Sequence, residues 1–144
     1  MKKYALVLLS LFLSISCSAQ PKNNLKKAVL EYTASSRGFY QKITIENQMV
    51  TVSKDRKEIE KPIATKISAA DWKELVGYFK TIPLDSLEML KAPTKKRFHD
   101  GAAIAHFKVI YKDKTLETDA FDHGYPPEAI KKLVTKINSF AKKE

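Results

Sequence analysis

The chain has a single cysteine and only four glycines among its 144 residues. Cys17 lies close to the N-terminus, so the region that follows can form no disulfide and offers no cysteine nucleophile. Four glycines are too few for a glycine-rich phosphate-binding loop, and no serine lies in a G-x-S-x-G pattern. We therefore expect a domain that depends on its hydrophobic core and that lacks these catalytic motifs.

Long apolar runs are also missing, apart from one short stretch at the N-terminus. Two lysines precede apolar residues from Tyr4 to about Ile15, fewer than the roughly 20 residues that a membrane-spanning helix needs. Small residues follow, and the pattern is typical of a secretory signal peptide over residues 1–19. The sequence therefore predicts an exported protein.

Two cleavage sites are compatible with this signal peptide. The residues "LSIS" before Cys17 resemble a lipoprotein signal, in which Cys17 becomes the lipid-bearing first residue, although Ser14 stands where leucine is usual. Ordinary cleavage after Ala19 is the alternative. Either site leaves a polar tether over residues 20–27 and one domain over residues 28–144. We favour an outer-membrane or periplasmic lipoprotein over a secreted or periplasmic soluble protein.

The charge of the chain is strongly of one sign. Its formal net charge of +10 falls to +8 when the two lysines of the signal peptide are removed. An excess of lysine favours anionic partners, or serves only solubility. Because export argues against nucleic acid, we expect an envelope protein or an anionic surface as partner, with membrane contact only through the lipid. We expect a monomer without a cofactor.

Alternation of apolar and polar residues predicts strands in the first half of the domain. Three of them are predicted over residues 28–34, 39–46 and 49–55. Asn47 and Gln48 form the turn between the last two. Residues 59–67 predict a further extended segment, which Pro62 restricts to an edge strand or a bulged one.

Two amphipathic helices are predicted. Ser68 is the expected N-cap of the first helix, with Asp71 three residues later in a capping-box pattern, and Pro83 ends it. The second helix begins near Pro126, where a proline is tolerated in the first turn. Its exposed face carries Lys131, Lys132 and Lys136, and this basic face is either simply solvated or contacts an anionic partner.

Residues 102–111 and 114–121 predict a second hairpin, with a two-residue turn at Lys112 and Asp113. In that register Ala105 pairs with Ala120, His106 with Asp119, and Gly101 with Gly124. The complete order β-β-β-(β)-α-β-β-α predicts an α+β fold. We expect an antiparallel sheet of about four to six strands, packed on one face by both helices.

The same hairpin predicts a cluster of polar side chains at its open end. His99 and Asp100 precede the first strand, and Asp122 and His123 follow the second. Strand spacing places all four within roughly 10 Å of one another. The remaining candidates for this cluster are Arg37, in a glycine-adjacent turn, and Tyr125.

This cluster has two interpretations. Two histidines and two aspartates are able to bind zinc or a similar ion, or to act in acid–base chemistry. Alternatively, the aspartates accept backbone N–H bonds in turns and the cluster only locks the end of the sheet. No His-x-x-x-His or cysteine spacing supports a metal, so we predict no metal ligand and no catalytic residue.

Three segments, "YTASSRGFYQKI", "APTKKRFHDGAAIA" and "FDHGYPP", resemble a group of small exported proteins and lipoproteins of unknown function from Bacteroidota. The resemblance covers about residues 28–140 and implies export and a small α+β domain. We predict a non-enzymatic, lipid-anchored binding domain of the cell envelope. The alternative is a metal-binding protein or hydrolase that uses His99, Asp100, Asp122 and His123.

Overall fold

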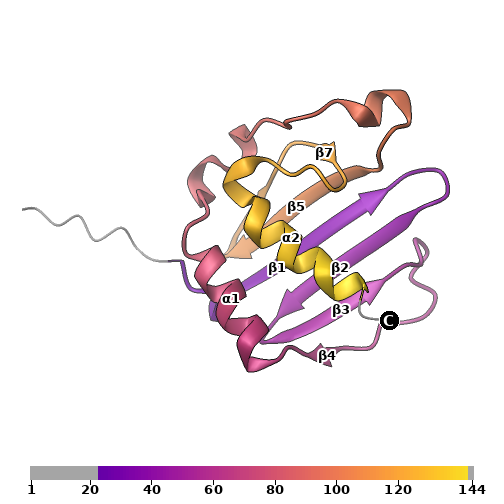
Figure 1. Cartoon of the computed structure of the whole chain (residues 1–144). Coiled ribbons are helices and arrows are strands. Elements are labelled where there is room, and N and C mark those ends of the chain that lie inside the picture. Colours follow the sequence, from indigo (N-terminus) through magenta and orange to yellow (C-terminus); the bar gives the residue numbers. More distant parts are fainter. Residues whose placement is uncertain (1–22, 143–144) are drawn as a thin grey trace, which may run out of the picture.

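The computed structural model describes residues 23–142, so the predicted signal peptide and Cys17 lie outside the described residues. The described chain forms an antiparallel sheet with two main helices on one face (Figure 1). This confirms the predicted α+β class. The strand order is β4-β3-β2-β1-β5-β6, and β7 pairs with β5 as well, which makes seven strands, slightly more than expected.

The first four strands form one half of the sheet. They are β1 (Ala28–Ser35), β2 (Tyr40–Glu46), β3 (Met49–Ser53) and β4 (Thr65–Lys66). Asn47 and Gln48 have φ of 50° and 63°, values typical of the two-residue hairpin turns whose twist matches that of paired strands. The extended segment predicted over residues 59–67 shortens to β4, because the ladder begins only beyond Pro62, which has no N–H to donate.

The core lies between the sheet and the helices. Every second residue of β1 is buried, as expected for a strand with one covered face. The strands contribute side chains that are at most 1% exposed, including Leu30, Tyr32, Ile43, Ile45 and Phe107. The helices contribute Leu75, Phe79, Leu133 and Ile137.

Helix α1 (Ala69–Phe79) begins as predicted, because the Oγ of Ser68 accepts a hydrogen bond of 3.1 Å from the Asp71 amide. Helix α2 (Lys131–Ser139) begins later than predicted. The 3-10 turn η4 (Glu128–Ile130) precedes it, and η5 (Phe140–Lys142) follows. Ile130 has ψ of 2° and breaks the helical path, while its side chain is buried in the core.

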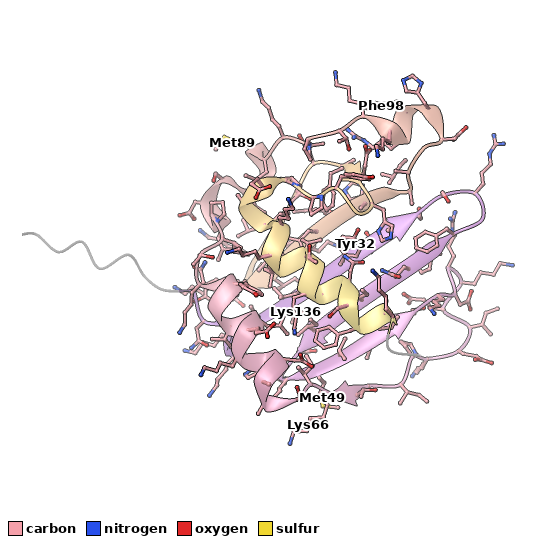
Figure 2. The ribbon with its side chains drawn as sticks, in the orientation of Figure 1. Tyr32, Met49, Lys66, Met89, Phe98 and Lys136 are labelled. Atoms are coloured by element: carbon pink, nitrogen blue, oxygen red, sulfur yellow. The ribbon has the colours of Figure 1, made fainter. Side chains whose placement is uncertain are left out.

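A long connection between α1 and the second hairpin runs along the upper edge of the domain in Figure 1. It contains two 3-10 turns, η2 (Leu84–Met89) and η3 (Lys96–His99). Met89 and Phe98 point outward from this edge (Figure 2) and are 72% and 66% exposed. The inner side of the connection packs towards β6 and β7.

The second hairpin starts in the predicted register. Strands β5 (Ile104–Tyr111) and β6 (Lys114–Glu117) are joined by Lys112 and Asp113, which have φ of 51° and 60°. Lys108 pairs with Glu117, and Val109 pairs with Leu116. Lysine and aspartate thus form the tight turn in place of the more usual asparagine and glycine.

The register then shifts by one residue, which contradicts the predicted pairing further along. In β7 (Phe121–Asp122), Phe121 pairs with Ala105 and Asp122 with Ile104. The one extra residue before β7 acts as a β-bulge and brings the fully buried Phe121 to the core face. Predictions that paired Ala105 with Ala120 and Gly101 with Gly124 are therefore wrong.

The predicted partner of His106 changes for the same reason. Its Nδ1 lies 3.6 Å from the Oε1 of Glu117, so Glu117 replaces the predicted Asp119. Both side chains are more than a third exposed, and the contact stabilises the sheet little.

Candidate functional site

A tight turn separates the surroundings of Asp122 and His123. The Tyr125 amide donates a hydrogen bond of 2.8 Å to the Asp122 carbonyl. Gly124, third in the turn, has φ of +87°, a conformation that glycine adopts without strain. Asp122 contacts the connection around η3, whereas His123 contacts Tyr32 of β1. The two halves of the "DH" pair therefore have different structural roles.

Asp122 is a fully buried carboxylate that holds the long connection against the sheet. It accepts hydrogen bonds from Thr94 Oγ1 at 2.5 Å and from the Lys96 amide at 2.6 Å. The amide and the Nη1 of Arg97 each donate one more, both at 3.0 Å. The backbone donors belong to the first residues of η3, whose amides have no partner within the turn.

These contacts keep Asp122 ionised. Burial by itself raises the pKa of this carboxyl group, but the hydrogen bonds from Thr94, Arg97 and Lys96 outweigh burial and lower the pKa from 3.8 to about 2. The Arg97 side chain is only 12% exposed and supplies a compensating positive charge. Asp122 is thus a carboxylate whose hydrogen-bonding capacity is already used within the domain.

The other predicted members of the cluster lie elsewhere. His99 and Asp100 are exposed at the end of η3, where Asp100 has φ of 55°. The Gly101 amide closes this turn with a hydrogen bond of 2.9 Å to the Lys96 carbonyl. Arg37 is exposed in the turn between β1 and β2. The arginine that pairs with Asp122 is Arg97, the second residue of η3.

Tyr125 is 42% exposed, and the Nζ of Lys96 lies 3.8 Å from the centre of its ring. This cation–π contact further joins the connection to the turn. Across residues 23–142, no group of three or more His, Cys, Asp or Glu side chains is arranged to hold a metal ion. The predicted four-residue cluster is therefore not assembled as one site.

His123 belongs to a second group of polar residues, under helix α2. Its Nδ1 lies 2.7 Å from the hydroxyl of Tyr32, a fully buried side chain. Burial raises the pKa of Tyr32, although a hydrogen bond with Asn138 partly opposes this effect. Burial, followed by the charge of Lys142, lowers the pKa of His123. Tyr32 is therefore a protonated donor and His123 a neutral imidazole at neutral pH.

Asn138 of α2 extends this group of hydrogen bonds. Its Oδ1 accepts from the Nε2 of Gln41 in β2 at 2.8 Å, and its Nδ2 donates to the Val134 carbonyl at 3.0 Å. Gln41 is only 7% exposed. The two hydrogen-bonded pairs, Tyr32 with His123 and Gln41 with Asn138, thus form a polar network from β1, β2, α2 and the turn after β7, in which each pair restricts the orientation of its two side chains.

The network opens into a cleft between α2, the start of β2 and the turn after β7. The cleft has a volume of about 220 Å³. Its lining consists of Gln41, His123, Gly124, Pro126, Val134, Thr135, Asn138 and Lys142. Figure 2 shows Tyr32 on the sheet beside α2, on the side of the helix away from α1. We name this hollow the His123 cleft.

The predicted basic face is smaller than the sequence suggests. Lys136 lies between the helices (Figure 2) and donates to Asp71 Oδ1 and Glu74 Oε2, both at 2.7 Å. These hydrogen bonds raise the pKa of Lys136. Lys131 lies 3.4 Å from Glu128, and Lys132 is exposed. Because α1 supplies carboxylates to Lys136, this lysine joins two helices and does not present a free charge.

Four important residues were not anticipated: Arg97 and Thr94 at Asp122, and Gln41 and Asn138 beside the cleft. Gln41 had a weak signal, because a polar residue occupies a position of β2 that alternation directs to the core. The polar run around Arg97 predicts only an ordinary loop. Its role depends on the burial of Asp122, which the local sequence does not reveal.

Comparison with protein-family models, curated proteins and solved structures found no match. The resemblance to exported Bacteroidota proteins stays a prediction. No helix among residues 23–142 has both the length and the apolar character required to cross a membrane.

Proposed function

We propose that this protein is an exported, lipid-anchored binding domain of the cell envelope, without a catalytic role, and that its ligand occupies the His123 cleft. One observation supports the location: two hydrogen-bonded pairs, Tyr32 with His123 and Gln41 with Asn138, border an open hollow. Polar groups that are oriented before a ligand arrives lose little entropy on binding. A few such groups with apolar neighbours are typical of small-molecule sites.

The alternative, a metal-binding protein or hydrolase built on the His-Asp cluster, has less support. It requires His99 and Asp100 to act together with Asp122 and His123. Asp122 is buried and accepts four hydrogen bonds, while His99 and Asp100 are exposed. A carboxylate with its acceptor sites occupied is poorly suited to bind an ion or to move a proton.

Blocking the cleft tests the proposed location. Thr135 lines the hollow from α2 and is exposed, so Thr135→Trp fills the space with little effect on the core. Thr115→Trp, at an exposed position of β6, is the matched control. Thr135 also lines a second hollow on α2, so Lys132→Trp, which lines only that second hollow, is a further control that should retain binding. Mature protein is immobilised, and a solubilised envelope fraction is passed over it.

We expect a component that is retained by wild type and by Thr115→Trp, and lost with Thr135→Trp. Thermal melts of each variant establish that all of them are folded. Equal retention by Thr135→Trp would show that recognition occurs elsewhere on the surface.

The proposed anchor is tested separately by mass spectrometry of the mature N-terminus. A lipoprotein begins at Cys17 with a lipid attached, and Cys17→Ser abolishes this modification. An unmodified chain that begins after Ala19 would instead establish ordinary cleavage and a soluble exported protein.

A further inference from the structure

We infer that the His123 cleft binds a carboxylate, which accepts a hydrogen bond from the Nε2–H of His123 and lies beside the ammonium group of Lys142. This inference rests on the proposed function and specifies the chemistry of its ligand. A small free acid and the C-terminus of a peptide share this group. The cleft contains the donors, the charge and the space that a carboxylate requires, and each is supported by different contacts.

The hydrogen-bond network determines which nitrogen of His123 carries the proton. The Tyr32 hydroxyl is buried and lies 2.7 Å from the Nδ1 of His123. A protonated phenol that is removed from water needs an acceptor for its proton, and Nδ1 is the side-chain atom within hydrogen-bond distance of it, so Tyr32 donates to Nδ1. A neutral imidazole that accepts at Nδ1 carries its proton on Nε2.

The Nε2 of His123 is not enclosed by the protein. Within residues 23–142, Nδ1 takes part in the hydrogen bond of this ring, and no side-chain nitrogen or oxygen is both buried and without a partner. Nε2 is therefore accessible from the cleft that His123 lines. The ring is held in place by Tyr32 and by Phe39, whose ring centre lies 5.3 Å away, so the donor has a defined direction.

The charges around the cleft favour an anion. Lys142 is the charged residue of the lining, and no aspartate or glutamate belongs to it. Lys142 is close enough to His123 for its positive charge to act on the imidazole. A hydrogen bond from a neutral donor to a carboxylate, next to an ammonium group, is stronger than a bond between two neutral groups.

The size and the remaining lining limit the ligand to a small molecule or the end of a chain. A volume of about 220 Å³ exceeds the roughly 150 Å³ of a cavity that holds benzene. Val134 and Pro126 provide apolar walls beside the polar end. A carboxylate with a short apolar group therefore matches the cleft better than a sugar or a nucleotide.

Matched acids and amides test this inference on the mature protein. Benzoate and benzamide represent the free acid, and N-acetyl-dialanine and its C-terminal amide represent the peptide end. Binding is followed by NMR, through the side-chain amides of Gln41 and Asn138 and the backbone amide of Gly124. We expect at least one acid to shift these signals and to bind about tenfold or more tightly than its amide, the loss expected for one charged hydrogen bond.

The outcomes distinguish recognition of a carboxylate from ligand binding in the cleft in general. Preference for benzoate would identify a small free acid, and preference for the dipeptide acid would identify a chain end. Equal affinity of acid and amide would overturn the carboxylate inference and leave ligand binding in the cleft intact. Signals that do not move with any of the four compounds would also overturn it, while the Thr135→Trp experiment independently decides whether the cleft is used at all.

Variants of the two proposed contacts provide a second test. Lys142→Gln should weaken binding of the preferred acid about tenfold, whereas Lys132→Gln, an exposed lysine outside the cleft lining, should leave it unchanged. The double variant Tyr32→Phe with His123→Phe removes the donor without leaving a buried hydroxyl alone, and it should abolish acid binding. Unchanged affinity in Lys142→Gln and in the double variant would exclude the proposed contacts.

The protonation of His123 can be observed directly by nitrogen-15 NMR of its ring. We expect a protonated Nε2 and an Nδ1 that accepts a hydrogen bond. Tyr32→Phe should produce a mixture of tautomers and weaken acid binding severalfold, because the donor at Nε2 is then only partly populated. A proton on Nδ1 in the wild-type protein would contradict the inferred orientation of the site.

Discussion

Asp122 and His123 are covalent neighbours, yet their side chains lie in opposite kinds of environment. Asp122 is buried among donors that stabilise its negative charge, and its pKa falls to about 2. His123 is held in partly apolar surroundings near a positive charge, and its pKa is also lowered, so that it stays neutral. At neutral pH these shifts favour the ionised form of Asp122, which stabilises the fold, and the neutral form of His123, which the proposed ligand contact requires.

Replacing the buried carboxylate should destabilise the domain. Asp122→Asn removes the charge opposite Arg97 and places an amide N–H against the donors from Thr94 and Lys96. We expect a loss of about 3 kcal/mol in the free energy of unfolding, measured by urea denaturation, because a buried charge is left without its partner. Asp100→Asn, at an exposed turn position, should change it by less than about 0.5 kcal/mol.

The difference in stability between wild type and Asp122→Asn should depend on pH. The pKa of Asp122 is lowered from 3.8 in the unfolded chain to about 2 in the folded domain. Its contribution to stability is therefore present above pH 3.8 and is lost as the pH falls towards 2. The difference in stability between wild type and Asp122→Asn should shrink over this interval. A difference that stays constant down to pH 2 would contradict a role for the ionised carboxylate.

At the scale of the elements, the bulge before β7 determines which side chains of β7 face the core. β5 pairs Lys108 with Glu117 on one side of the bulge and Ala105 with Phe121 on the other. Without the bulge Ala105 would pair with Ala120, so the register shifts by one residue. In a strand, such a shift exchanges the two faces of every later residue. Phe121 thereby reaches the core, while Asp122 meets the connection that contains η3.

Removing one residue from the bulge should reverse these faces. Deletion of Asp119 would restore a continuous ladder, direct Phe121 outward and place Asp122 towards the core. We expect a loss of at least about 3 kcal/mol in stability, the magnitude seen when a buried phenylalanine is truncated, measured by urea unfolding followed with circular dichroism. Deletion of Glu60, an exposed residue between β3 and β4, should cost far less. Comparable losses for the two deletions would show that the bulge has no special role.

The two helices also depend on each other through one lysine. Lys136 of α2 binds Asp71 and Glu74 of α1 and is only 17% exposed. A residue that looks like one charge of a basic stripe therefore determines how α2 lies against α1. The His123 cleft is lined by the same helix, so this contact also positions Asn138 and Thr135.

The free energy of local unfolding should differ between parts of the domain. β1 pairs with β2 on one side and β5 on the other along its length, whereas β4 contributes only two exposed residues at the sheet edge. In hydrogen exchange followed by NMR, we expect the slowest amides in β1 and the fastest in residues 54–66. Local opening is easiest where few contacts are buried. Slower exchange in β6 than in β1 would contradict this order.

Much of the architecture could be predicted because its signals are local. Alternation in β1, β2 and β3 and the apolar stripes of both helices are periodic patterns, and Ser68 is a cap readable within one turn. The initial register of the second hairpin followed from its short turn. Pairing failed only beyond Thr118, because a single inserted residue leaves no clear mark in the sequence.

The residues alone determined the α+β class, the covered face of the sheet, the start of α1 and a polar end of the second hairpin. Tertiary structure decided which polar groups meet. Tyr32 and His123 are 91 residues apart, and Gln41 and Asn138 are 97 apart. Local pattern cannot relate such distant positions, because their contact depends on the register after the bulge and on the packing of α2 over β2. Asp122 became a structural anchor, and His123 a candidate ligand contact, only when the chain was folded.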